Sequence, residues 1–167
     1  MHLLPLLAAA TLLAAASCSS DCSENRNALP LAGFYVTDSA TRQISVSGLR
    51  VEGVGAQGDS LLFDGASAVS QLYLPFRIDS DETVYRFSAQ GADSLAGSEI
   101  SSTVTFRYSR RAKFVSRECG VSYVYTLEDV SCSGLLIDSV VPLTDEITNV
   151  NEENMRIYFS PSALDMQ

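Results

Sequence analysis

The sequence predicts an all-β fold, a single β-sandwich of immunoglobulin-like or Greek-key type. About ten short runs rich in β-branched and aromatic residues follow one another at spacings of about 8–12 residues, separated by Gly, Asp, Ser and Pro. Several runs alternate apolar and polar residues, as a strand with one buried face does. Beyond residue 18 no stretch shows sustained helical periodicity. These observations assign residues 28–160 to one sandwich domain.

The expected strands can be placed from the turn residues that separate them. They cover residues 31–36, 43–54, 60–63, 70–76, 83–88, 101–109, 113–116, 121–127, 135–141 and 155–159. The alternation is clearest at Val104, Phe106 and Tyr108, which share one face, and it recurs over residues 121–127. We therefore expect these two segments to contribute one face each to the core.

Three places interrupt this pattern. Between residues 43 and 54 the apolar positions shift by one residue across Ser47 and Gly48, which predicts a bulge or bend. Residues 89–98 have the composition of a loop, and residues 161–167 that of a flexible tail.

Residues 1–17 predict a lipoprotein signal peptide. Their apolar run is shorter than the roughly 20 residues of a membrane span, and small residues follow it directly before Cys18. This arrangement resembles the lipobox of bacterial lipoproteins, in which the cysteine is acylated, with palmitate among its acyl chains, and becomes the new N-terminus. The resemblance implies a lipidated tether over residues 18–27 and an outer-membrane lipoprotein that faces the periplasm or the cell surface. A plain cleaved signal, with Cys18 uninvolved, is the alternative.

The composition argues against several classes of function. A formal charge of −9, from 11 basic and 20 acidic residues, disfavours nucleic acid as a partner. The single histidine, His2, lies in the predicted signal peptide. The string GDSL at residues 58–61 names a family of serine hydrolases. In those enzymes a histidine acts as the base that deprotonates the serine, and residues 18–167 contain no histidine. We therefore interpret the string as a turn, and we expect no catalytic residue, no cofactor and no metal site.

Asp79, Asp81 and Glu82 have the spacing that opens a calcium loop. An EF-hand loop starting at Asp79 would need glycine and glutamate where Val84 and Gln90 stand. We interpret the segment as an acidic hairpin tip, and a looser calcium site stays open as the alternative.

A compact basic strip contrasts with the acidic remainder of the chain. Its members, which fall within eleven consecutive positions that hold no acid, are Arg107, Arg110, Arg111, Lys113 and Arg117. Such a strip could bind lipid phosphates, an acidic glycan or an acidic protein surface. The simpler interpretation, which we favour, is a solvated hairpin whose arginines pair with nearby acids.

With Cys18 assigned to lipid, three cysteines remain as disulfide candidates in an oxidising compartment. Cys119 could pair with Cys22 or with Cys132, and the difference in loop-closure entropy does not decide between them. Cys132 could equally be a free, buried, small apolar residue.

The string FVSRECG at residues 114–120, together with Cys22 near the anchor, LYLP at 72–75 and FRYSR at 106–110, resembles a family of small Bacteroidota lipoproteins of unknown function. The resemblance implies an envelope lipoprotein with a β-rich domain and a Cys22–Cys119 disulfide. Genes of that family often neighbour one for an outer-membrane β-barrel protein, so the resemblance implies a barrel as a candidate partner. It implies no activity.

Taken together, these features predict a non-catalytic, lipid-anchored protein of the cell envelope that binds or scaffolds another outer-membrane or periplasmic component. A module that binds a glycan or a small ligand on the same anchor is the alternative. An exposed aromatic cluster in a groove would favour the ligand, whereas a bare strand edge or an apolar patch would favour a protein partner.

Overall fold

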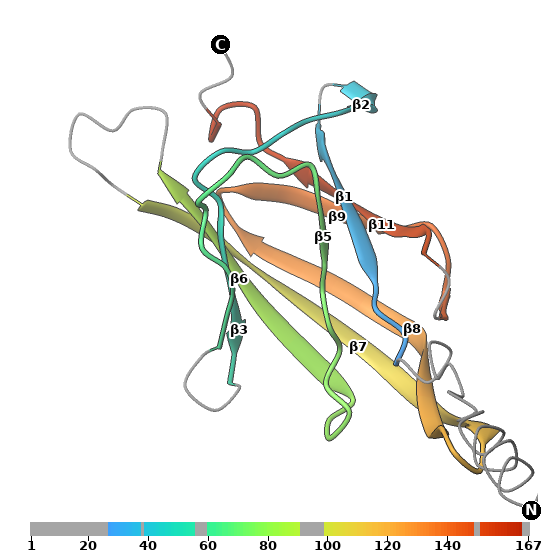
Figure 1. Cartoon of the computed structure of the whole chain (residues 1–167). Coiled ribbons are helices and arrows are strands. Elements are labelled where there is room, and N and C mark those ends of the chain that lie inside the picture. Colours follow the sequence, from blue (N-terminus) through green and yellow to red (C-terminus); the bar gives the residue numbers. More distant parts are fainter. Residues whose placement is uncertain (1–26, 38, 56–59, 91–98, 149–150, 165–167) are drawn as a thin grey trace, which may run out of the picture.

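The computed structural model describes residues 27–37, 39–55, 60–90, 99–148 and 151–164. These residues form two β-sheets packed face to face, which confirms the expected β-sandwich (Figure 1). Cys18, Cys22 and the predicted signal peptide lie outside the described residues. Within the described ranges, no helix has the length and hydrophobicity needed to cross a bilayer.

The first sheet brings together the two ends of the domain. Its order is β2-β1-β11-β9, and β5 also pairs with β1. β1 is antiparallel to β2 and β5 but parallel to β11, with Phe34 opposite Ile157. The bounds are Leu31–Val36 (β1), Ser39–Gln43 (β2), Gln71–Tyr73 (β5), Ile137–Pro142 (β9) and Glu153–Phe159 (β11).

The second sheet is antiparallel throughout, and its order is β10-β8-β7-β6-β3-β4. Its edge strands, β10 and β4, are short, and β6 and β3 lie between β4 and the long β7–β8 hairpin. The bounds are Arg50–Val54 (β3), Ser60–Phe63 (β4), Glu82–Gln90 (β6), Glu99–Ser116 (β7), Gly120–Gly134 (β8) and Glu146–Ile147 (β10).

The strands differ from the expected ones mainly in where they break. The stretch 43–54 is not one strand: β2 ends at Gln43, Val46 makes only an isolated bridge to Val69, and β3 begins at Arg50. Gly48 lies between these pieces with a φ of 66°, which a residue with a side chain rarely adopts. The predicted bend is therefore strong enough to end the strand.

Two further expectations differ from the structure: a gap between two strands, and a flexible C-terminal tail. Residues 101–109 and 113–116 form one strand, β7, because β8 supplies hydrogen-bonding partners along both segments. At the C-terminus, the expected tail begins with residues that pack on the domain, since Ala163 is buried in the core and its N–H donates to Ser160 O.

The core lies between the sheets and is rich in aromatic rings. Phe34 and Phe159 of the first sheet meet edge to face at 5.2 Å. On the other sheet, Val104, Phe106 and Tyr108 of β7 are buried on one face, as their alternation predicts. Phe76, from the segment between β5 and β6, stacks on Tyr108 with 4.3 Å between ring centroids.

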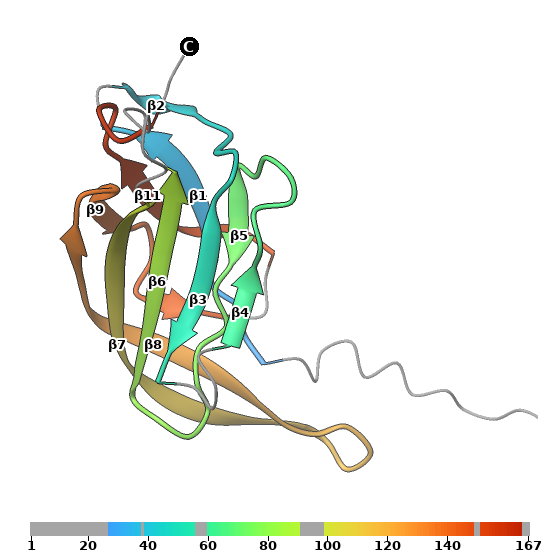
Figure 2. The same ribbon diagram turned by 90° about the vertical axis from the view of Figure 1, so that its left-hand side faces the viewer.

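The β7–β8 hairpin is longer than the sheet that carries it. β6 accompanies β7 only as far as the pair Glu82–Arg107, whereas β7 continues to Ser116. The hairpin consequently projects beyond the body of the sandwich (Figures 1 and 2). We call residues 109–126 the hairpin end.

Tyr125 lies where the hairpin leaves the core. Its hydroxyl is buried and has no hydrogen-bond partner among the described residues. Burial, and after it the neighbouring Tyr108, raises the pKa of Tyr125 to about 12, against about 10 for an unfolded tyrosine. The folded state therefore resists ionisation of this group. Its contribution to stability is complete below about pH 10 and is lost as the pH rises through about 12.

We predict that Tyr125→Phe leaves the free energy of unfolding unchanged or slightly higher at pH 7, because it removes an unpaired buried hydroxyl. Between pH 7 and about pH 11 the variant should lose less stability than the wild type. Urea unfolding at both pH values measures this difference. The control Tyr73→Phe, at an exposed position, should lose as much as the wild type. Equal losses for Tyr125→Phe and the wild type would contradict the prediction.

Candidate functional site

The basic strip predicted from the sequence lies along the β7–β8 hairpin. Arg107, Arg110, Arg111 and Lys113 are on β7, and Arg117 is in the turn that joins it to β8. The turn itself is tight: Cys119 N–H donates to Ser116 Oγ at 3.0 Å, and Gly120 has a φ of 78°.

Three of the five cations have an acidic partner. Arg107 pairs with Glu82 at 3.3 Å, Arg110 with Asp81 at 2.5 Å, and Arg111 with Glu146 at 3.2 Å. The antiparallel pairing of β6 with β7 positions the first two, because it places the start of β6 beside Arg107. The favoured interpretation of the strip, arginines that pair with nearby acids, therefore describes these three residues.

Lys113 and Arg117 differ from the other three. Both are exposed, and neither has an acidic partner among the described residues. They lie on the hairpin end, where the one acid of the turn is Glu118. The part of the strip with free positive charge is thus the part farthest along the hairpin.

Large apolar side chains accompany these free cations. Phe114 is 67% exposed and Val121 is 47% exposed, and the two are cross-strand partners. Partners in register lie on the same face of a hairpin, so the two side chains form one apolar patch. The alternation over residues 121–127 predicted that this face is buried, and at Val121 the projection of the hairpin prevents that burial.

The start of the described chain lies against this hairpin. Ala28 N–H donates to Tyr123 O, and Tyr123 N–H donates to Asn27 Oδ1, at 2.9 and 3.0 Å. Cys119 is on the same hairpin, in the turn. Among the described cysteines Cys132 is a free thiol, half-buried on β8, and burial followed by the charge of Asp138 raises its pKa.

The carboxylates of the acidic segment at residues 79–82 form ion pairs with arginines. Arg77 donates to both carboxylate oxygens of Asp79 at 3.1 and 3.2 Å, and this hydrogen bonding holds the pKa of Asp79 below its usual range. Asp81 and Glu82 face Arg110 and Arg107, as described above. Each of the three carboxylates thus has its own arginine, and the described residues contain no cluster of acids, cysteines or histidines that could hold a metal ion.

An apolar cleft of about 260 Å³ opens beside the edge strand β4. One wall is Leu61 and Leu62 of β4, and the other is the segment that runs from Pro75 to Arg77. Leu61 is 49% exposed. The Tyr85 hydroxyl closes the floor of the cleft by donating to Pro75 O. The sequence does not reveal this cleft, because its two walls are not neighbours in the chain and meet only in the fold.

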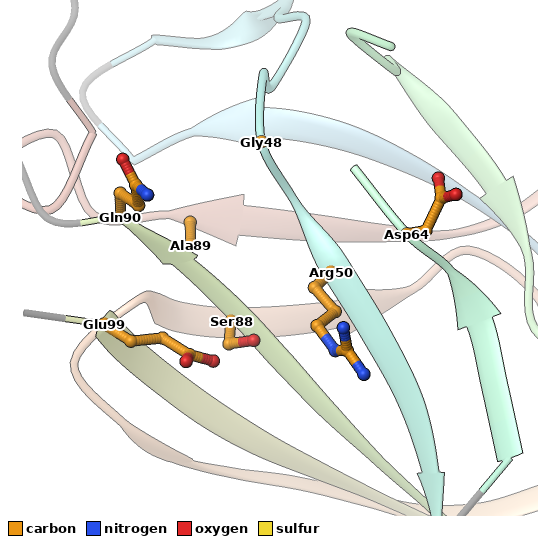
Figure 3. A pocket seen from close by; sticks show the side chains of 7 residues that line it. All are labelled: Gly48, Arg50, Asp64, Ser88, Ala89, Gln90 and Glu99. Atoms are coloured by element: carbon orange, nitrogen blue, oxygen red, sulfur yellow. The ribbon is translucent and has the colours of Figure 1, made fainter. Parts of the chain in front are cut away.

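A second, polar pocket of about 220 Å³ lies at the other end of β3, where β6 ends and β7 begins (Figure 3). Arg50, Asp64, Ser88, Gln90 and Glu99 contribute its polar side chains. Arg50 is already ion-paired with Glu52 at 2.7 Å. The two carboxylates, Asp64 and Glu99, stand on opposite sides of the pocket, with Arg50 between them (Figure 3).

The GDSL string falls at the entry to β4. Ser60 begins that strand and is exposed, while Gly58 and Asp59 lie outside the described residues. His2, the one histidine of the sequence, lies outside the described residues, so the described part of the chain supplies Ser60 with no histidine as a base.

Comparison with known proteins identifies one family. The profile described as "Family of unknown function (DUF6452)" matches residues 44–159. No curated protein and no solved structure matches the chain.

We predict that neutralising the paired arginines has little effect on stability. Because the pairs are largely exposed to solvent, Arg107→Gln and Arg110→Gln should each change the free energy of unfolding by less than about 1 kcal/mol. Phe76→Ala, which empties the centre of the aromatic cluster, should cost about 3–5 kcal/mol. Urea denaturation of the three variants tests the comparison. A loss at either arginine as large as that at Phe76 would show that the strip stabilises the fold.

Proposed function

We propose that this chain, which belongs to the DUF6452 family of unknown function, is a non-catalytic, lipid-anchored protein of the cell envelope that binds another envelope protein. The observation that carries this proposal is the apolar cleft beside the edge strand β4. An exposed sheet edge next to an apolar cleft is the arrangement that accepts an extended segment of a partner.

The chemistry of such binding follows from the strand. The outer edge of β4 presents backbone N–H and C=O groups, and a partner strand would satisfy them by extending the sheet. Alternate side chains of that strand would enter the cleft and contact Leu61 and Leu62. The fitting partner is therefore an extended segment with apolar residues at every second position. The opposite edge strand of the same sheet, β10, is less suited, because it is only two residues long.

The aromatic residues support a protein partner over a glycan. Most of the tyrosines and phenylalanines are in the core, and the strongly exposed ones, Tyr73 and Phe114, lie on different sheets. The described surface therefore has no aromatic groove on which a sugar could stack. The alternative function, binding of a glycan or small polar ligand, would rely on the polar pocket of Figure 3.

The anchor is the second part of the proposal. Cys18 lies outside the described residues, so its acylation, the palmitate and the outer-membrane location rest on the lipobox pattern. The proposed orientation, with the domain facing the periplasm or the surface, rests on the same pattern. By resemblance to the Bacteroidota lipoproteins, an outer-membrane β-barrel protein is a candidate partner.

A disulfide between Cys22 and Cys119 is also part of the proposal. Asn27 and Ala28 lie beside Tyr123, and Cys119 is four residues before Tyr123 along the hairpin. Cys22 is five residues before Asn27, a stretch that spans at most about 17 Å. The two cysteines are thus within reach of each other, and the free thiol of Cys132 removes the competing partner.

We predict that Cys18→Ala abolishes signal processing and acylation, because no other residue of the lipobox can carry the thioether-linked lipid. Metabolic labelling with a palmitate analogue, followed by membrane fractionation, measures this outcome. Cys132→Ala is the matched control and should keep its label. Unchanged labelling of Cys18→Ala would exclude the lipid anchor.

We also predict that a photo-crosslinking residue at position 61 captures one discrete envelope protein in intact cells. The same residue at position 135, which is 75% exposed on the β8–β9 connection, should capture none. Leu61→Asp should abolish recovery of the partner from solubilised membranes while leaving the far-UV circular dichroism unchanged. Equal labelling at both positions would count against the cleft. Binding of an oligosaccharide that Glu99→Gln abolishes would favour the alternative function.

A further inference from the structure

We propose that the hairpin end is a second membrane contact, at which Phe114 and Val121 enter the headgroup region of the bilayer while Lys113 and Arg117 bind the phosphates of anionic lipids. The proposal rests on the lipid anchor proposed above. It assigns a role to the hairpin, whereas the protein partner is assigned to β4.

The first observation is an apolar stripe that leaves the core along one face of the hairpin. Tyr125 is buried, Tyr123 is half-buried, and Phe114 and Val121 are exposed. Their positions alternate along β7 and β8, so they share a face. The stripe ends in solvent because β6 does not accompany β7 past Arg107.

The second observation is the placement of the free cations. In the ladder between β7 and β8, Lys113 stands opposite Ser122, so its side chain lies on the other face of the hairpin from Phe114. Arg117 is in the turn. An aromatic and a branched apolar residue flanked by long basic side chains is the combination that settles at a membrane interface. The basic end also stands out on a chain whose formal charge is −9, so it is the part suited to an anionic lipid surface.

The third observation is the distance to the anchor. The described chain begins beside Tyr123, two residues along β8 from Val121. Cys18 is nine residues before Asn27, which limits their separation to about 30 Å. The tether therefore starts at the hairpin end itself, and a lipid on Cys18 would hold this end, rather than β4, near the bilayer. An anchor and a nearby basic patch together give a more stable attachment than either alone.

The chain has no tryptophan, so Phe114→Trp introduces a single fluorescent reporter at the proposed contact. The mature, acylated protein is reconstituted into vesicles of phosphatidylethanolamine and phosphatidylglycerol. We expect the emission of Phe114→Trp to shift to shorter wavelength and to be quenched by brominated lipid. Leu135→Trp is the matched control at another exposed apolar position, and its emission should stay that of a water-exposed indole.

The charge requirement is tested in the same protein. Lys113→Gln and Arg117→Gln in the Phe114→Trp background should each lower the insertion equilibrium about 5-fold. Arg107→Gln, whose charge is already paired, should have a smaller effect. Replacing anionic phosphatidylglycerol with phosphatidylcholine should likewise weaken insertion and so reduce the quenching of Phe114→Trp by brominated lipid.

Each outcome bears on the proposal. If Phe114→Trp resembles Leu135→Trp in vesicles that carry the anchored protein, the membrane contact is excluded although the anchor stands. If its emission shifts only when solubilised envelope proteins are added, the hairpin end binds protein, which also overturns the proposal. If the protein is found not to be acylated, the anchor of the proposed function fails. In that case vesicles are added to the non-acylated Phe114→Trp protein. Quenching of its emission by brominated lipid would support the membrane contact of the hairpin end, and unchanged emission would exclude it.

Discussion

The antiparallel ladder between β7 and β8 is the constraint on which the rest of the structure depends. It runs from the pair Ser102–Gly134 to the pair Ser116–Gly120, with register shifts after Arg107 and after Phe114. Its inner part supplies the central strands of the six-stranded sheet, and its outer part forms the hairpin end. One set of backbone hydrogen bonds therefore joins the core to the surface that carries the free charges.

The ladder is held at its root by aromatic packing. Phe76 stacks on Tyr108 and meets Tyr125 edge to face at 5.4 Å. The Tyr108 hydroxyl also bonds Thr83 at 2.7 Å and donates to Arg77 O at 2.9 Å. These contacts connect the hairpin to the 75–77 segment, which is one wall of the apolar cleft. The two surfaces assigned to a membrane and to a protein partner are thus supported by the same cluster.

Much of the fold could be predicted from alternation, because a period of two specifies which residues share a face. It placed Val104, Phe106 and Tyr108 correctly in the core. It could not tell that Phe114, which follows the same alternation along β7, is exposed to solvent. Burial depends also on where the opposing sheet ends. Likewise, the sequence identified the basic strip but not which acids face it, since the pairing of β6 with β7 decides that. The cleft beside β4 was not predicted at all, because no local pattern marks the meeting of distant segments.

The parallel pairing of β1 with β11 has a consequence for how the protein reaches its folded state. The strands that pair are separated by about 120 residues, so the first sheet cannot close before the last strand is available. A topology that depends on such distant pairing folds slowly. For a chain exported as proposed above, such slow closure would keep the domain unfolded while it crosses the membrane.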